Sequence, residues 1–217
     1  MKNKVIEAIE EHKIIAILRG VPKDKLIATA EALHKGGIRL LEITYSANGS
    51  VSDCETAENI KALSEHFKGK LYIGAGTVLT PKQVRRTKAS GGFFIISPNT
   101  DKKVIRTCNK CGLVSIPGAL TPSEIVKANQ YGADFIKLFP IEGFGTEYVK
   151  AVRAPLSDVK FLAVGGINEN NMAEYLSIEI SGFGIGSNII NKKMIANDDW
   201  SGITDLAAKY TKVVNNA

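Results

Sequence analysis

Short apolar runs recur along the chain, and each is followed by a turn and then by an amphipathic segment. The runs begin about 20 to 31 residues apart, which is the spacing that parallel strands joined by crossover helices need. The pattern therefore predicts eight strands, each followed by a helix. The expected strands are Ile14–Leu18, Leu40–Thr44, Leu71–Gly74, Phe93–Ser97, Leu113–Ile116, Phe135–Phe139, Lys160–Ala163 and Gly182–Ile185.

The segments between these runs carry helix signals. Thr80-Pro81 and Thr121-Pro122 each place a threonine where it can cap a helix and a proline at the first helical position. The stretch from Met1 to Lys13 predicts a short N-terminal helix. Because no Pro/Ser-rich linker divides residues 1–217, the eight βα units favour a single-domain (β/α)8 TIM barrel. An open, doubly wound sheet is the alternative.

Charge and hydropathy narrow the class of partner. The formal net charge is +6, but the lysines are scattered, so we expect no nucleic-acid partner. A mild positive field suits anionic metabolites instead. No run of 18 or more apolar residues exists, which predicts no membrane span. The N-terminus lacks the apolar core of a signal peptide, and we therefore expect a cytoplasmic location.

Lys137 interrupts the sixth apolar run, Phe135-Ile136-Lys137-Leu138-Phe139-Pro140. Removing an ammonium group from water is costly unless something compensates it. A lysine in a buried strand is therefore either half of a structural ion pair or an amine kept for chemistry. Burial disfavours the charged form and lowers the lysine pKa, which supplies the neutral amine that a Schiff-base nucleophile needs.

Glu42 is the acid that the second expected strand offers to Lys137. Side chains alternate along a strand, so both residues project into the barrel if the faces that carry them point inward. A buried structural ion pair is one interpretation. We favour an amine nucleophile with an acid/base beside it, because barrel active sites lie at the C-terminal ends of the strands and because buried pairs are weak sources of stability.

An amine and a carboxylate together suit one reaction class. The lysine attacks a ketone to give a carbinolamine and then an iminium, which draws electrons from an adjacent C–C bond, while Glu42 carries protons. This chemistry needs no metal and no cofactor. The sequence also predicts no metal cluster, because His12, His34 and His66 all fall on expected helices.

Glycine-rich turns follow the seventh and eighth expected strands. Gly165-Gly166 and Gly186-Ser187 occupy the positions where barrels often bind phosphate through backbone N–H groups. Glycine lets the backbone approach an anion closely. Plain tight turns are the alternative interpretation of each motif alone. Their occurrence after both strands favours a phosphate site.

Further candidates end other strands. In Gly74-Ala75-Gly76-Thr77 we expect the glycines to leave room for a ligand and the Thr77 hydroxyl to hold a carboxylate. Arg19 could hold the same anion, although a surface arginine is the alternative. Pro98 and Phe139 are expected to shape the mouth and the wall of the pocket, chiefly as structural residues.

Taken in order, the strand-end motifs resemble those of the 2-keto-4-hydroxyglutarate / 2-keto-3-deoxy-6-phosphogluconate (KHG/KDPG) aldolases. The resemblance runs from about residue 5 to residue 212. The motifs that carry it are Ile15-Ala16-Ile17-Leu18-Arg19-Gly20, Leu41-Glu42-Ile43-Thr44, Gly74-Ala75-Gly76-Thr77-Val78, Ile96-Ser97-Pro98, Ile116-Pro117-Gly118, Lys137-Leu138-Phe139-Pro140 and Val164-Gly165-Gly166-Ile167.

The resemblance implies a class I aldolase on a (β/α)8 barrel, usually a homotrimer. It would cleave a 2-keto-3-deoxy sugar acid 6-phosphate to pyruvate and glyceraldehyde 3-phosphate. It implies that Lys137 forms the Schiff base and that Glu42 is the acid/base. Thr77 and the loop after the second strand, Ser46 included, would contact the pyruvate carboxylate. Gly165, Gly166 and Ser187 would bind phosphate.

Two positions depart from the common pattern of that family. Ser46 stands in the loop after the second strand, where several members carry an arginine, so carboxylate binding would rest more on Arg19 and Thr77. Ala163-Val164 replaces a Pro-Thr that many members have before the double glycine. The related 2-keto-3-deoxy-6-phosphogalactonate aldolases often have Ala-Val there, which leaves the sugar epimer open.

Two other functions fit a barrel with phosphate loops. One is an isomerase or decarboxylase of sugar phosphates, which does not require an imine-forming lysine. The other is a non-catalytic sugar-phosphate-binding barrel. The presence of Lys137, Glu42 and Thr77 favours the aldolase over both.

Overall fold

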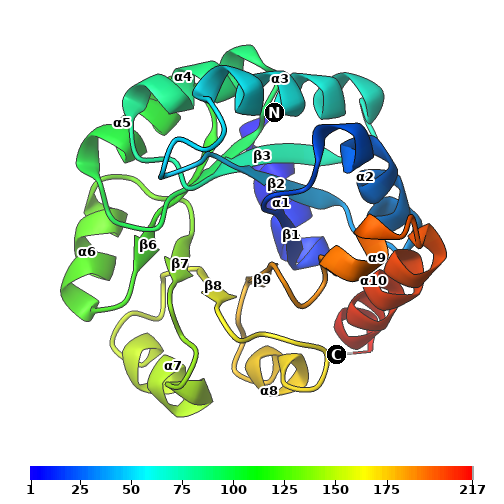
Figure 1. Cartoon of the computed structure of the whole chain (residues 1–217). Coiled ribbons are helices and arrows are strands. Elements are labelled where there is room, and N and C mark those ends of the chain that lie inside the picture. The colour runs from blue at the N-terminus through cyan, green and yellow to red at the C-terminus, as the bar shows by residue number, and fades with distance from the viewer. Residues whose placement is uncertain (217) are drawn as a thin grey trace.

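A computed structural model describes residues 1–216, in which parallel strands form a ring surrounded by helices (Figure 1). The strands follow the order β5-β4-β3-β2-β1-β9-β8-β7-β6. Their bounds are β1 Ile14–Leu18, β2 Leu40–Thr44, β3 Tyr72–Gly76, β4 Phe94–Ile96, β5 Val114–Ile116, β6 Gly118–Ala119, β7 Ile136–Leu138, β8 Phe161–Val164 and β9 Gly182–Ile185.

Helices follow the strands and cover the outside of the ring. Each of the eight segments predicted as a strand overlaps an observed strand, and α1 confirms the expected N-terminal helix. The helices are α1 Lys2–His12, α2 Leu26–Lys35, α3 Asp53–His66, α4 Pro81–Ala89, α5 Lys102–Lys110, α6 Pro122–Gln130, α7 Gly145–Arg153, α8 Met172–Leu176, α9 Lys192–Ala196 and α10 Trp200–Asn215, with a 3₁₀ turn at Lys23–Lys25 before α2.

The structure has a ninth strand that was not predicted. The predicted strand Leu113–Ile116 contains β5, which pairs with β4. After Pro117 comes β6, which pairs with β7, where Gly118 lies opposite Lys137. The Lys137 N–H donates to the Pro117 carbonyl at 2.9 Å, and the Phe135 N–H donates to the Ser115 carbonyl at 3.2 Å. These bonds join the two ends of the sheet, so the architecture is the predicted barrel and not the open sheet.

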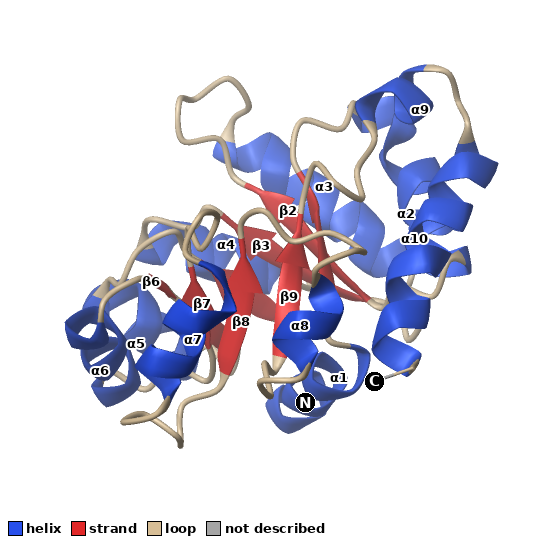
Figure 2. Ribbon diagram, turned by 90° about the horizontal axis from the view of Figure 1, so that it is seen from below, coloured by secondary structure: helices blue, strands red, loops and turns tan. Residues whose placement is uncertain are grey.

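The apolar core has two layers. The larger one lies between the strands and the surrounding helices. The smaller one fills the interior of the barrel, where Val5 and Ile9 of α1 pack with Ile15, Leu40 and Phe94 of the strands. Figure 2 shows α1 beneath the starts of the strands and the loops at their opposite ends. The helix therefore closes the N-terminal end of the barrel, and a cavity lies at the C-terminal end.

The predicted helix starts at threonine and proline are confirmed. Thr80 accepts from the Gln83 N–H and Thr121 accepts from the Glu124 N–H, each within a capping box that satisfies two backbone donors.

No helix within residues 1–216 is long and apolar enough to cross a membrane.

Candidate active site

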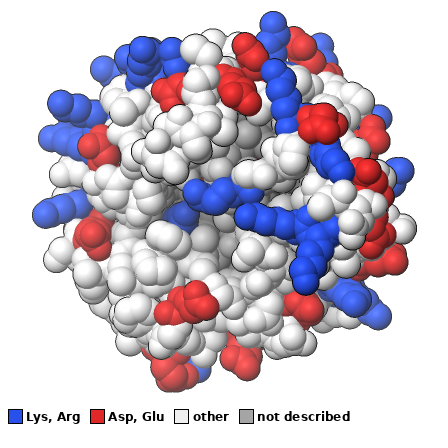
Figure 3. Space-filling view, viewed as in Figure 1, with Lys and Arg blue, Asp and Glu red and all other residues white. Residues whose placement is uncertain are grey.

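The C-terminal ends of the strands surround a cavity of about 680 Å³. Figure 3 shows the hollow at the centre of this face, with Lys and Arg side chains extending over it. Nine of the residues predicted for the site line this cavity. They are Arg19, Thr77, Pro98, Lys137, Phe139, Gly165, Gly166, Gly186 and Ser187.

Lys137 and Glu42 both point into the barrel, as strand alternation predicted. Lys137 lies at the centre of β7 and is 7% exposed, through the cavity. Glu42, in β2, is 1% exposed. Within residues 1–216 no ion pair joins the two, and Glu42 Oε2 has no hydrogen-bond partner there. A structural ion pair would hold the two groups in contact, so this arrangement favours the chemical interpretation.

Burial controls the protonation of both groups. It lowers the pKa of Lys137, with Arg19 adding to this effect and Glu42 opposing it. It raises the pKa of Glu42, against the attraction of Lys137 and Arg19. The lysine is thus shifted towards the free amine, and the carboxyl group towards holding a proton at higher pH. These are the directions that a nucleophile and a general acid/base require.

Two glycines of β3 make room for side chains inside the barrel. A methyl group on Gly76 would overlap Oε1 of Glu42, and one on Gly74 would overlap the ring of Phe94. The expectation that these glycines leave room for a ligand was therefore wrong. Their absent side chains create the space that Glu42 and Phe94 fill, and Gly76 determines where the carboxylate can lie.

Phe139 lies against the amine. The Lys137 Nζ atom is 4.3 Å from the centre of the Phe139 ring, within the range of a cation–π contact. The ring also lines the cavity. Phe139 thus restricts the position of the amine and forms part of the wall, as the sequence predicted.

Arg19 and Thr77 form a polar pair at the mouth. The Arg19 Nη2 group donates to Thr77 Oγ1 at 3.1 Å. Thr77 adopts the left-handed φ of 54°, which is costly for a residue other than glycine. Hydrogen bonds of the adjacent Gly76 and Val78 to neighbouring strands hold the backbone in place. A guanidinium beside a fixed hydroxyl can bind a carboxylate.

The two glycine-rich turns lie together on one side of the cavity. Gly165 and Gly166 have φ values of 108° and 69°, which glycine adopts without strain. The side chain of Asn188 donates to the Ile167 carbonyl at 2.7 Å and so links the turn after β8 to the turn after β9. Within the described residues the N–H groups of Gly165, Gly166 and Ser187 make no hydrogen bond. They are therefore available to an anion.

Ser46 was expected to contact the carboxylate, but it is not among the residues that line the cavity. Its hydroxyl group donates to Asn48 Oδ1 at 2.6 Å and lies 2.9 Å from the Ser50 hydroxyl. Ala47, and not Ser46, lines the cavity from this loop. The short polar side chain bonds within its own loop, so contact of Ser46 with a bound carboxylate would require this loop to rearrange.

Sequence reasoning missed several residues that line the cavity. Glu142 follows β7, and Lys192 begins α9. Both lie beyond the strand ends, in loops whose path the apolar pattern does not define. Their charge was the available signal, but it does not distinguish them from other surface charges. Val164 also lines the cavity, whereas its neighbour Ala163 packs in the outer core.

Comparisons with known proteins identify similar chains. A family model described as "KDPG and KHG aldolase" matches residues 5–206. A probable 2-dehydro-3-deoxy-6-phosphogalactonate aldolase of Rhizobium meliloti (strain 1021) is 37% identical over 87% of this chain and 86% of its own. A 2-dehydro-3-deoxy-phosphogluconate aldolase of Treponema pallidum (strain Nichols) is 32% identical over 97% of each chain.

A solved structure adds a chemical observation about a relative. The KDPG aldolase of Legionella pneumophila, with pyruvate captured as a covalent carbinolamine intermediate, is 31% identical to this chain. Its TM-score is 0.83, over 94% of this chain and 96% of the other. The likeness in fold and the captured intermediate agree with the amine chemistry expected from a buried lysine.

The glycines of the two turns are expected to tolerate alanine differently. A methyl group on Gly165 would lie 3.3 Å from the Ile141 nitrogen, on a backbone with positive φ. One on Gly186 would meet only Ile17 Cβ, at 3.9 Å, with ordinary φ. We expect Gly165→Ala to lower the free energy of unfolding by about 1 kcal/mol or more, and Gly186→Ala by less than about 0.5 kcal/mol. Urea denaturation measures both, and equal losses would contradict this description of the turns.

Proposed function

The chain belongs to the KDPG and KHG aldolase family and is a lyase, and we propose that it cleaves 2-keto-3-deoxy-6-phosphogluconate to pyruvate and glyceraldehyde 3-phosphate through an imine at Lys137. The observation that carries this proposal is the buried amine of Lys137 at the floor of the cavity, with the carboxyl group of Glu42 in the same interior. Neither group is neutralised by a direct ion pair within residues 1–216.

The proposed chemistry follows from these two groups. The Lys137 amine attacks the C2 ketone, and loss of water from the carbinolamine gives an iminium. Glu42 takes the proton of the C4 hydroxyl as the C3–C4 bond breaks, and the electron pair enters an enamine while the C4 aldehyde leaves. Protonation of the enamine at C3 and hydrolysis of the imine then release pyruvate and restore the amine.

Both ends of such a substrate are anionic, and the cavity offers donors for two anions. We assign the carboxylate to Arg19 and Thr77, whose mutual hydrogen bond supports a joint role. We assign the phosphate to Gly165, Gly166, Gly186 and Ser187. The unpaired N–H groups of that side and the link through Asn188 support this assignment.

Cleavage of 4-hydroxy-2-oxoglutarate to pyruvate and glyoxylate would use the same amine and acid/base. A second candidate substrate is 2-keto-3-deoxy-6-phosphogalactonate, which differs in configuration at C4. Two observations favour it: Val164 of the Ala163-Val164 pair lines the cavity, and the Rhizobium meliloti relative is named for this epimer. Cleavage rates measured on the two six-carbon phosphates decide which epimer is preferred.

The other functions that the sequence left open have less support. An isomerase or decarboxylase of sugar phosphates does not require an imine-forming lysine beneath the cavity. A non-catalytic barrel does not need an unpaired buried carboxyl group, which costs stability. The homotrimer that the resemblance implies stays a prediction. Sedimentation equilibrium tests it.

Trapping of the imine tests the proposed nucleophile. Borohydride added with pyruvate is expected to reduce the imine to a stable secondary amine, which mass spectrometry locates on Lys137. Lys137→Ala is expected to abolish the adduct, because burial lowers the pKa of this lysine in particular. Exposed Lys103 is the matched control, and Lys103→Ala should be trapped like the wild type. An adduct on another lysine, or none, would overturn the mechanism.

Gly76 tests the position of the acid/base. In Gly76→Ala the new methyl group must displace the Glu42 carboxyl group, so we expect kcat to fall about 100-fold or more, as for loss of a general acid/base. Glu42→Gln should show a similar loss. Both variants should still bind pyruvate, measured by its competitive inhibition of cleavage.

Ala75 supplies the control for Gly76. It lies between the two glycines but packs in the outer core, so Ala75→Gly should lose stability and keep its kcat. Normal turnover by Gly76→Ala would contradict the described position of Glu42.

A further inference from the structure

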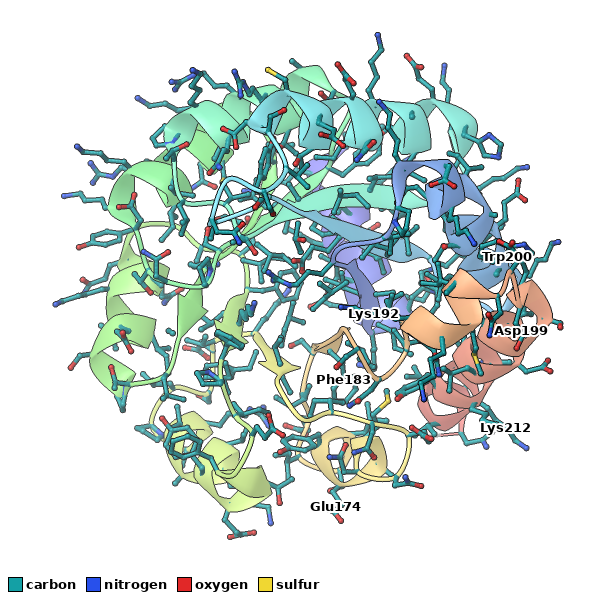
Figure 4. All side chains as sticks on the ribbon, in the orientation of Figure 1. Glu174, Phe183, Lys192, Asp199, Trp200 and Lys212 are labelled. Atoms are coloured by element: carbon teal, nitrogen blue, oxygen red, sulfur yellow. The ribbon has the colours of Figure 1, made fainter. Side chains whose placement is uncertain are left out.

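Four charged side chains line the cavity within the described residues: Arg19, Lys137, Glu142 and Lys192. Lys137 is the proposed nucleophile, and Arg19 donates a hydrogen bond to Thr77. Lys192 belongs to none of the strand-end motifs, because it begins α9, six residues beyond Gly186. It nevertheless lines the cavity together with both glycine-rich turns. Figure 4 labels Lys192 and shows it extending from the start of α9 towards the mouth of the barrel.

The backbone that carries Lys192 is fixed on both sides. Before it, the N–H groups of Ile189 and Ile190 donate to the Gly186 carbonyl at 3.0 and 2.9 Å. After it, the N–H groups of Lys193 and Met194 donate to the Asn191 side chain, which caps α9. The position of the Lys192 Cα atom therefore follows from that of the turn after β9.

The far end of α9 is held by a different lysine. Lys25 Nζ donates to the carbonyls of Ile195 and Ala196 at 3.1 and 3.0 Å and pairs with Asp198 at 3.0 Å. Ile195 is buried beneath the helix. This short helix is thus attached to the barrel, which fixes the backbone that carries Lys192 beside the cavity.

The ammonium group of Lys192 is available to a ligand. It forms no hydrogen bond and no ion pair in the part of the chain that the structure describes. The unused N–H groups of Gly165, Gly166 and Ser187 belong to turns that line the same cavity, and Ser187 lies in the turn that leads to α9. Those groups supply only partial charges, whereas a phosphate monoester carries a charge of nearly −2 at neutral pH. A full cation is what this side of the cavity otherwise lacks.

We propose that Lys192 is a specificity-determining residue, whose ammonium group pairs with the phosphate of the substrate and makes the enzyme prefer phosphorylated 2-keto acids. This inference rests on the proposed function. Arg19 and Lys192 then stand at opposite ends of the bound substrate, one for each anion. Without Lys192 the phosphate would lie near the Glu142 carboxylate with no cation to offset their repulsion. Glu142 therefore increases the expected loss of affinity when Lys192 is removed.

Lys192→Gln and Lys193→Gln form a matched pair for the test. Both lysines are exposed and adjacent on α9, but only Lys192 lines the cavity. We expect Lys192→Gln to lower kcat/KM for 2-keto-3-deoxy-6-phosphogluconate about tenfold, mainly through KM, because a charge-assisted contact is lost. Lys193→Gln should match the wild type, and Lys192→Arg should recover most of the loss.

Two further measurements separate this role from a structural one. Inorganic phosphate should inhibit the wild type competitively, and its Ki should rise in Lys192→Gln but not in Lys193→Gln. Trapping of pyruvate, which lacks a phosphate, should be equal in all three proteins. Equal KM and Ki values in the two glutamine variants would overturn the role of Lys192. Failure of the wild type to trap pyruvate or cleave substrate would instead overturn the proposed function.

Discussion

The desolvation of Lys137 is the constraint on which the rest of this structure depends. An ammonium group inside an apolar barrel is unfavourable, so burial shifts the side chain towards its neutral amine. Glu42 is buried nearby without a direct ion pair among the described residues. A salt bridge would restore the lysine pKa and occupy the nucleophile. The separation of the two groups keeps both available at the cost of stability.

Several features of the fold maintain this burial. Helix α1 closes the N-terminal end of the barrel with Val5 and Ile9, so water reaches Lys137 only from the cavity. Gly76 gives the Glu42 carboxyl group its space. The Pro117 carbonyl, between β5 and β6, accepts the Lys137 N–H, which fixes the backbone of the nucleophile. The barrel thus positions a reactive amine through backbone bonding and excluded volume, and the loops are left to recognise the two ends of the substrate.

The apolar periodicity was sufficient to predict the barrel, because each strand of a ring covered by helices is a short apolar run of its own. It did not predict β6, a two-residue strand that is defined by its pairing with β7. The strand-end residues could be predicted because the fold brings all C-terminal ends together. The residues beyond the strand ends could not be predicted. Ser46 bonds within its own loop, and Lys192 lines the cavity from the start of α9, outside the apolar runs.

The central claim concerns the protonation of one side chain, which NMR can observe directly. Lysine labelled with ¹³C at Cε reports the titration of each amine, and Lys137→Met identifies the resonance of Lys137 by its loss. We predict that Lys137 titrates below the ordinary lysine value of 10.5, because burial disfavours its charged form. Titration of Lys137 at or above 10.5 would show that its charge is compensated in the folded protein, and would contradict the account of a desolvated amine.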